Sequence, residues 1–402
     1  MIPMHKYSFF CIMIWAAFLL GCSRQSEKTM IADLLKQAQT TLAPDKRTAI
    51  FHVQGDLEGR TLTLRGEIQS GEMKEELLRF LKGKVPYGIA DSLSVLPQAN
   101  LGDRTIGVVS VSVANIRTKG DNAAEMANQA LLGTPVRLLK QGSDGWFLVQ
   151  TPDEYLGWTK DNIVRMTPDA YDSWTARPKV IVTTDFGIVR TGKEEASLPV
   201  SDVVIGDLLA VETVAGLYYH VLYPDGRKGY LAKAMAEPFG SWLLNAKDTP
   251  ERIVATAKRF FGIPYLWGGT SSKGMDCSGF TKMVYYLNGV LLPRDASQQA
   301  KVGIQVELTP DFTSVAPGDL LFFGSKATDR RPERVTHVAI SLGGKRFIHA
   351  SSYVQTNSLD PADSDYSEDR ALAFFYVKRI IGADERNGVR RISAIPYYRA
   401  LE

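Results

Sequence analysis

A long internal repeat is the feature that most constrains how this 402-residue chain folds. The segment VRLLKQGSDGWFLVQTPDEYLGWTKD, from Val136, aligns without a gap with LLAVETVAGLYYHVLYPDGRKGYLAK, from Leu208, at an offset of 72 residues. Aromatic, Pro-Asp and Gly-aromatic positions coincide, and Trp146 matches Tyr218. Each copy therefore predicts a strand, a turn, an aromatic strand, a Pro-Asp turn and a Gly-aromatic strand.

The period of the repeat favours tandem domains over a solenoid. Solenoid repeats recur about every 20 to 50 residues, whereas a period of 72 residues fits a small domain. Upstream of the two copies, NIRTK at Asn115 and GIVRTGK at Gly187 match as first strands. We therefore expect two small β-barrels, at residues 101–170 and 178–240, joined near TARPK.

The chain before the repeat predicts a small α/β domain over residues 23–100. After the polar segment SRQSEKTM, the pattern reads helix, two strands, helix and strand. The strands alternate, with Leu62 and Leu64 on one face. We expect no chemistry here, and His52 is interpreted as a structural strand residue.

The last third of the chain, residues 245–385, predicts an α+β domain. DTPERIVATAKRFFG carries helix signals, with Thr249 as N-cap and Pro250 in the first turn. After a glycine-rich loop, a second helix, CSGFTKMVYYLNG, begins at Cys277. The strand patterns DLLFFG, VTHVAISL and KRFIHASS follow, with a Gly-Gly hairpin turn between the last two. We expect the Cys277 helix to pack on an antiparallel sheet.

Residues 1–22 predict a signal peptide and export. Lys6 precedes an apolar run from Phe9 to Leu20 that is too short for a permanent membrane span. The closing LLGC resembles the lipobox of bacterial lipoproteins, in which the cysteine is acylated, so Cys22 is the candidate lipidation site. An ordinary secretory signal is the alternative. We expect a lipid anchor in a bacterial membrane, with the protein facing the periplasm or cell envelope.

Cys277 is then the one cysteine of the mature chain without a lipid, which excludes an intrachain disulfide. A free thiol has a pKa of about 8.5, so a thiolate nucleophile needs a positive field. The helix N-terminus supplies part of this field, and an imidazolium would supply the rest. Two of the five histidines, His337 and His349, lie on the arms of the predicted hairpin. We predict Cys277 as nucleophile, His337 as its base and His349 as the residue that orients the base.

The register of that hairpin has two alternatives. If the two glycines form the whole loop, His337 faces Ala350. With one extra loop residue, His337 faces His349 directly. Both alternatives place the two rings close together, because side chains of one face recur at every second residue.

Motifs in both regions resemble known families. The repeat resembles the bacterial SH3-like domains found beside cell-wall enzymes. YLWGG, DCSGF, PGDLLFF and THVAISLGGKRFIHAS resemble the NlpC-type papain-like cysteine peptidases, which cut peptides of the bacterial cell wall. The latter resemblance covers residues 245–385 and implies a papain-like α+β fold with Cys277, His337 and His349 as catalytic residues. It also implies an oxyanion held by backbone N–H groups and Tyr265, each donor being worth about 3 to 4 kcal/mol at the transition state.

With both barrels included, the chain resembles one subgroup, the γ-D-glutamyl-L-diamino-acid endopeptidases or dipeptidyl-peptidase VI. These enzymes release L-Ala-γ-D-Glu from stem peptides with a free L-Ala amine, so they must hold an ammonium group and block longer substrates. The resemblance implies a set of substrate-binding residues: Asp276, Ser278, Asp295, Trp267, Glu125 and Tyr155. Ala296, at a position where serine occurs in relatives, would cost one hydrogen bond without excluding the activity.

Some of these residues have structural alternatives. Asp276 could cap the helix that follows it, which is compatible with substrate binding. Asp295 could be a loop carboxylate paired with Arg294, and Glu125 a solvated loop residue. Gly279 is interpreted as room for the substrate backbone.

The leading hypothesis is a cysteine endopeptidase that cuts the γ-D-glutamyl-L-diamino-acid bond during cell-wall turnover or recycling. A broader D,L-endopeptidase or amidase acting on intact murein is one alternative, and a non-catalytic wall-binding lipoprotein is another. Whether the diamino acid is lysine or diaminopimelate is open, as are the membrane leaflet and the role of residues 23–100.

Expected partners are stem peptides, as tripeptide or tetrapeptide, and the membrane through the lipid. We expect a monomer without cofactors, and no metal, because one cysteine and two histidines have no fourth ligand at a suitable spacing. A net charge of only +3 without a basic run argues against nucleic acid.

Overall fold

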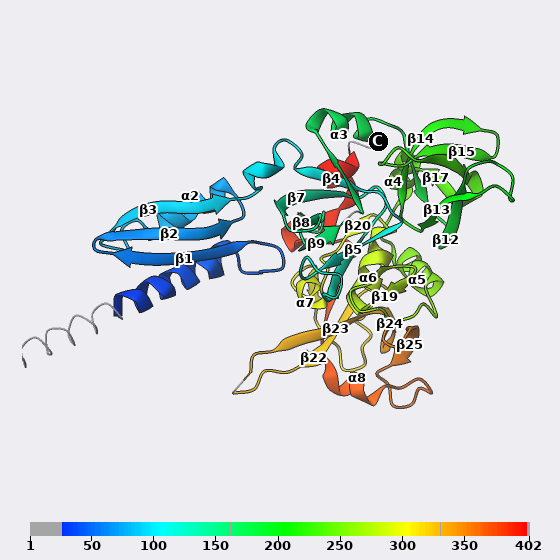
Figure 1. The fold of residues 1–402 in the computed structure, drawn as a ribbon. Coiled ribbons are helices and arrows are strands. Elements are labelled where there is room, and N and C mark those ends of the chain that lie inside the picture. The colour runs from blue at the N-terminus through cyan, green and yellow to red at the C-terminus, as the bar shows by residue number, and fades with distance from the viewer. Residues whose placement is uncertain (1–25, 161, 330, 400–402) are drawn as a thin grey trace, which may run out of the picture. The chain divides into compact units, whose positions relative to one another are not determined.

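The computed structural model describes residues 26–160, 162–329 and 331–399 (Figure 1). The predicted signal peptide and Cys22 lie outside these residues. Within them, no helix combines the length and the apolar character needed to cross a membrane. The chain divides into two compact units, Met1–Gly102 and Asp103–Glu402, each described by itself below.

The first unit contains a three-stranded sheet and two helical segments. Strand β2 is central, antiparallel to β1 and parallel to β3. Leu62 and Leu64 are fully buried, as their alternation predicts. The elements follow the predicted order: helical residues 26–42, β1 (Phe51–Glu58), β2 (Thr61–Ile68), α2 (Gly71–Leu81) and β3 (Gly88–Val95).

The repeat forms two seven-stranded sheets, here named the first and second β domains. The first contains β4 (Ile106–Val109), β5 (Val113–Arg117), β6 (Met126–Leu131), β7 (Pro135–Gln141), β8 (Trp146–Gln150), β9 (Leu156–Lys160) and β10 (Ile163–Met166). The second contains β11 (Lys179–Val182), β12 (Phe186–Arg190), β13 (Pro199–Val204), β14 (Leu208–Ala215), β15 (Tyr218–Leu222), β16 (Lys228–Ala232) and β17 (Ala236–Pro238). Helix α3 (Pro168–Thr175) connects them, next to TARPK.

The two β domains share one topology. The strand order is β10-β4-β7-β8-β9-β5-β6 in the first and β17-β11-β14-β15-β16-β12-β13 in the second. Trp146 pairs with Lys160 in the first domain, and Tyr218 pairs with Ala232 in the second, which is the same register 72 residues later. The gapless sequence repeat is therefore also a structural repeat.

The remainder of the second unit is an α+β domain, here named the C-terminal domain. Its antiparallel sheet has the order β21 (Ile304–Val306), β26 (Phe374–Arg379), β22 (Leu320–Ser325), β23 (Arg334–Gly343), β24 (Arg346–Ala350) and β25 (Val354–Ser358). Its helices include α4 (Phe239–Asn245), α5 (Pro250–Arg259), α6 (Cys277–Tyr286), α7 (Ala296–Gln299) and α8 (Glu368–Ala373).

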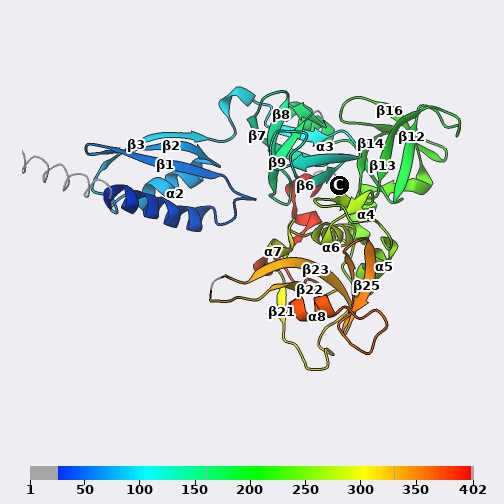
Figure 2. The same ribbon diagram turned by 60° about the horizontal axis from the view of Figure 1, so that its bottom comes forward.

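Helix α6 lies against this sheet (Figure 2). Phe280 and Val284 of α6 share a core with Val338 and Ile348 of the sheet, and all four side chains are fully buried. This helix-on-sheet packing agrees with the sequence-based expectation and positions the start of α6 at the strands that carry the histidines.

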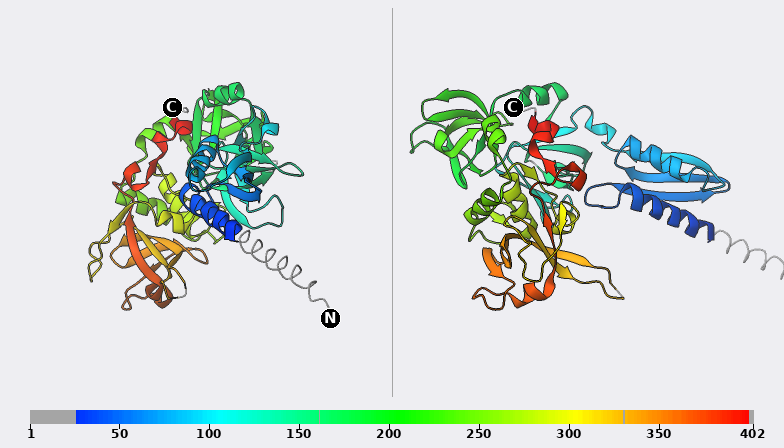
Figure 3. Two further views of the ribbon diagram at one scale, coloured as in Figure 1. Left: turned by 90° about the vertical axis from the view of Figure 1, so that its left-hand side faces the viewer. Right: turned by 180° about the vertical axis from the view of Figure 1, so that it is seen from behind.

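The C-terminal domain extends beyond residue 385, where the sequence pattern predicted its end. Strand β27 (Arg390–Arg391) pairs with β20 (Val290–Leu291), and α9 (Pro396–Arg399) follows. The buried Tyr398 joins the core beside Tyr286, and the Tyr397 hydroxyl donates a hydrogen bond to the Gly133 carbonyl of the first β domain. Figure 3 shows this segment, in red, beside that domain.

Candidate active site

Cys277 is the first residue of α6, as predicted. Asp276 is the N-cap, and its Oδ1 accepts a hydrogen bond from the Gly279 N–H at 2.7 Å. A Cβ on Gly279 would lie 2.0 Å from the Gly269 carbonyl oxygen, so only glycine lets the helix meet the preceding loop this closely. The interpretation of Gly279 as room for substrate is therefore wrong, because the chain itself fills that space.

The Cys277 thiol is buried against strand β23. The nearby backbone N–H groups of Ser278, in its own helix, and of Val338, in β23, act to lower its pKa. Val338 directly follows His337 in the chain. The strand against which α6 packs therefore carries the predicted base.

His337 and His349 form a hydrogen-bonded pair. His337 Nε2 lies 2.7 Å from His349 Nδ1, and the two rings are nearly perpendicular at 88°. Both side chains are buried, with exposures of 6% and 1%. The prediction that the rings lie together is confirmed.

The hairpin register matches neither predicted alternative. Ser341 pairs with Phe347, and the register shifts between Ser341 and Gly343. Continued toward the histidines, this pairing leaves His337 two residues short of a position opposite His349. The rings still meet because both project from one face of the sheet. The turn is closed by the pair Gly343–Arg346 and the irregularity lies at Leu342, which a pattern of alternating residues does not reveal.

Asn357 is a functional residue that the sequence reasoning missed. Its Oδ1 lies 2.9 Å from His349 Nε2, and its Nδ2 donates to the Asp365 carbonyl at 2.9 Å. With Nδ2 committed as donor, Oδ1 must accept a proton from His349 Nε2. Neutral His349 then accepts at Nδ1 from His337 Nε2–H, which leaves the lone pair of His337 on Nδ1. The network thus assigns Nδ1 of His337 as the basic atom for the thiol.

Burial sets the protonation states of these groups. It raises the pKa of the Cys277 thiol to about 11, with a further contribution from the Asp276 charge. It lowers the pKa of His337 well below its ordinary value and that of His349 to about 4. The expected lowering of the thiol pKa is therefore wrong for the unliganded site, because burial outweighs the field of the helix N-terminus. In the unliganded site, Cys277 is therefore a neutral thiol and His337 a neutral imidazole.

The Asp276 carboxylate is fully engaged within the protein. Arg294 binds it in bidentate fashion, with Nη1–Oδ1 at 3.0 Å and Nη2–Oδ2 at 2.5 Å, and the Gly268 N–H donates to Oδ2 at 2.9 Å. Ser278 Oγ accepts from the same guanidinium at 3.0 Å. The sequence reasoning considered Arg294 as a partner of Asp295, but the structure pairs it with Asp276. Asp276 is thus a helix cap and a buried ion-pair partner.

Tyr265 is half-buried next to the nucleophile. Its backbone N–H donates to Ser352 at 2.9 Å, which fixes it near the end of β24. Burial, and then the charge of Cys277, raise the pKa of the Tyr265 hydroxyl above its ordinary value. The phenol therefore stays protonated at neutral pH and is available as a hydrogen-bond donor.

The first β domain contacts the loops around Cys277. Trp267 Nε1 donates to Glu125 Oε1 at 2.7 Å, and the Tyr155 hydroxyl donates to Asp295 Oδ2 at 3.1 Å. Gly268 lies against β6, since a Cβ there would come within 2.3 Å of the Met126 carbonyl oxygen. The structure thus brings together four of the predicted substrate residues across the domain interface.

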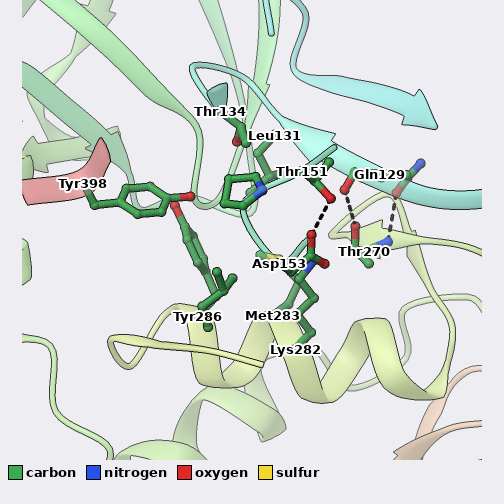
Figure 4. Close-up of a pocket in the computed structure, with 12 residues that line it drawn as sticks. Gln129, Leu131, Thr134, Thr151, Asp153, Thr270, Lys282, Met283, Tyr286 and Tyr398 are labelled. Carbon is green, nitrogen blue, oxygen red and sulfur yellow. Dashed lines mark hydrogen bonds and ion pairs between the residues drawn. The ribbon is translucent and has the colours of Figure 1, made fainter. Parts of the chain in front are cut away.

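The same interface continues along α6. Gln129 of β6 accepts from the Thr270 N–H at 2.9 Å, and Asp153 forms a buried ion pair with Lys282 of α6. A cavity of about 50 Å³ lies between these residues and Met283 (Figure 4). Cys277 does not line it, so it is a packing gap of the interface and not the substrate site. Among the described residues, no three His, Cys, Asp or Glu side chains are grouped to hold a metal ion.

Comparison with known proteins agrees with this geometry. Residues 262–375 match the NlpC/P60 family, and residues 116–162 match the bacterial dipeptidyl-peptidase Sh3 domain. The γ-D-glutamyl-L-lysine dipeptidyl-peptidase of Bacillus cereus is 32% identical over 64% of this chain and 77% of its own length. The chain belongs to the NlpC/P60 family. It is accordingly a cysteine peptidase.

A second curated relative and a solved structure are also similar to this chain. Dipeptidyl-peptidase 6 of Lysinibacillus sphaericus is 30% identical over 66% of this chain and 95% of its own length. The crystal structure of an NlpC/P60 family protein from Bacillus cereus has a TM-score of 0.57 and 24% identity, over 68% of this chain and 99% of that one, which shows a shared fold. The NlpC/P60 match contains Cys277, His337 and His349, and the Sh3 match contains Glu125 and Tyr155.

Proposed function

We propose that this peptidase cuts the γ-D-glutamyl-L-diamino-acid bond of stem peptides with a free N-terminal L-Ala and releases L-Ala-γ-D-Glu. The contact of Glu125 with Trp267 carries the proposal, because it joins the first β domain to the loop that leads into Cys277. A domain held at this loop would act as a wall that admits a short chain on the acyl side and excludes a longer one. The names of the two dipeptidyl-peptidase relatives agree with this specificity.

The ammonium group of L-Ala would be held by Glu125 and Asp295. Each of these carboxylates accepts a hydrogen bond from a neutral donor, Trp267 and Tyr155 respectively. The charge of Asp276 is instead offset by Arg294. Asp276, which the motifs also imply as an ammonium ligand, would in addition hold the loop that carries Gly268.

The reaction begins with proton transfer from the Cys277 thiol to Nδ1 of His337. The sulfur attacks the γ-carbonyl carbon of D-Glu, and the resulting oxyanion accepts a hydrogen bond from the Tyr265 hydroxyl. Protonated His337 then gives its proton to the amine of the diamino acid, which leaves, and a thioester remains. His337 takes a proton from water, the hydroxide displaces the sulfur, and L-Ala-γ-D-Glu is released with the thiol restored.

The decisive experiment compares L-Ala-γ-D-Glu-L-Lys with its N-acetyl form. We expect kcat/KM to fall about 10- to 100-fold on acetylation, since the exposed Glu125 and the half-buried Asp295 then lose their cation. Glu125→Gln should raise KM for the free-amine peptide, whereas Glu385→Gln, an exposed site in a distant turn, should not. Equal cleavage of both peptides would refute the free-amine requirement. Release of peptides from intact sacculi at a similar rate would favour the broader endopeptidase instead.

We also propose export and a lipid on Cys22, which the LLGC motif supports. Labelling with a palmitate analogue in a bacterial host should mark the wild type and not Cys22→Ala. The second β domain would be a second SH3-like domain, which its strand order supports. We further propose that the protein is a monomer, to be tested by light scattering.

A further inference from the structure

Arg370 is a charged residue whose guanidinium interacts electrostatically with Cys277 and which has no part in the proposed reaction. It lies on α8 and is half-buried. Its Nη2 donates a hydrogen bond of 3.4 Å to Ser351 Oγ, and its guanidinium lies 5.9 Å from the centre of the Phe323 ring. The guanidinium is thus held over an aromatic face at the end of the catalytic strands.

The charge of Arg370 is not matched by an ion pair among the residues that the structure describes. Other buried or half-buried arginines of this domain have carboxylate partners, as Arg294 has Asp276 and Arg379 has Asp319. A partly desolvated guanidinium is costly unless an anion approaches it. Burial lowers the pKa of Arg370, and the Cys277 and Asp369 charges act against this, but an arginine remains protonated.

Arg370 lies on the histidine side of the site. The ring of Phe323, over which it is placed, also packs on the ring of His337 at 5.6 Å. Its hydrogen-bond partner Ser351 follows His349 by two residues. The proposed ammonium-binding carboxylates come from other elements, the first β domain and the N-cap of α7. Because His337 protonates the leaving amine, the leaving diamino acid must lie next to the histidines, where Arg370 is also located.

We propose that Arg370 binds the α-carboxylate of the diamino acid and so selects tripeptides that end at this residue. This inference rests on the proposed function, and it names the leaving-group contact that the sequence left open. In a tetrapeptide the same carboxyl is an amide without charge, so the ion pair is lost. Arginine suits this role because its planar fork pairs with both oxygens of a carboxylate.

The test measures kcat/KM on three peptides with free L-Ala amines. The reference is L-Ala-γ-D-Glu-L-Lys, the second carries a C-terminal lysine amide, and the third has D-isoglutamine in place of D-Glu. We expect the lysine amide to be cut about 10- to 100-fold more slowly than the reference by the wild type. Arg370→Gln should bring that ratio close to one, and Arg370→Lys should retain part of it. Arg386→Gln, which removes a highly exposed arginine, is the matched control and should keep the full ratio.

The outcomes distinguish failure of the role of Arg370 from failure of the proposed peptidase function. Equal rates for acid and amide in the wild type, or a full ratio in Arg370→Gln, would overturn the role of Arg370. Loss of discrimination against the isoglutamine peptide in Arg370→Gln, with the lysine-amide ratio intact, would also overturn it. If the wild type cuts none of the free-amine peptides, the proposed function itself fails. Should Arg370→Gln prove unfolded by circular dichroism, the wild-type ratio and Arg370→Lys still decide.

Discussion

Replacement of Asp276 by asparagine separates two roles of this carboxylate. Asparagine caps a helix about as well as aspartate, so the hydrogen bond to Gly279 is retained. What the variant loses is the negative charge that offsets Arg294. The Arg294 side chain is only 1% exposed, and its Nε has no hydrogen-bond partner. After the substitution, the guanidinium keeps only the neutral Ser278 hydroxyl and the charge of Asp295 as compensation.

The structure gives the expected size of the effect. Removing one partner of a buried ion pair costs about 3 to 5 kcal/mol. At about 2 to 4 °C per kcal/mol for a large domain, Tm should fall by about 6 to 20 °C. The matched control is Asp360→Asn, whose pair with Lys345 is about one-third exposed and should contribute less than about 1 kcal/mol.

The assay combines calorimetry with kinetics on free and N-acetylated peptides. We expect Asp276→Asn to have a lower Tm. We also expect kcat/KM to fall by the same factor for the free and the N-acetylated peptide, because the loops around Cys277 are then misplaced. Addition of Arg294→Met should recover part of the stability, because the buried charge is then removed. A variant with unchanged Tm whose KM rises for the free-amine peptide alone would refute this reasoning and make Asp276 an ammonium ligand.

Four other predictions follow from the site. Cys277→Ala should abolish cleavage, as measured by peptide release, while Tm, measured by calorimetry, should change little. Asn357→Ala should lower kcat by about 10- to 100-fold with little change in KM, because His349 loses its fixed tautomer; rescue by Asn357→Gln would agree, and an unchanged kcat would contradict it. Burial holds the pKa of His349 at about 4 against about 6.5 in the unfolded chain, so the unfolded state binds the extra proton between these values. Stability should therefore be full above pH 6.5 and fall by up to about 3 kcal/mol as the pH drops toward 4, and urea titrations that show no such slope would refute it. Gly268→Ala should weaken discrimination against N-acetylated peptides, since its φ of +77° and its contact with Met126 leave no space for a Cβ.

Local patterns were sufficient for much of the fold and part of the site. The N-cap position of Asp276 and the start of α6 follow from short-range signals, and so does the shared face of the two histidines. The repeat predicted that the two β domains share one strand order, because both copies have turn and aromatic residues at the same positions. These features depend on residues that are close in the chain.

Contacts between distant segments could not be predicted from the sequence in this way. The Asp276–Arg294 pair and the Asn357 contact depend on which loops meet, and nothing in LPRDASQ or VQTNS specifies a partner. The hairpin register depends on one shifted residue. The thiol pKa depends on burial by several elements at once, which outweighs the local field of the helix. Tyr397 and Tyr398 were missed because the last segment has no regular period.

The contact of Tyr397 with Gly133 has a consequence for folding. It joins residues 264 positions apart in the chain, so forming it closes a very long loop at a cost in chain entropy. Contacts between distant segments form more slowly than local hairpins. The alignment of the first β domain with the C-terminal domain should therefore come late in folding, after the strands that carry His337 and His349 have paired.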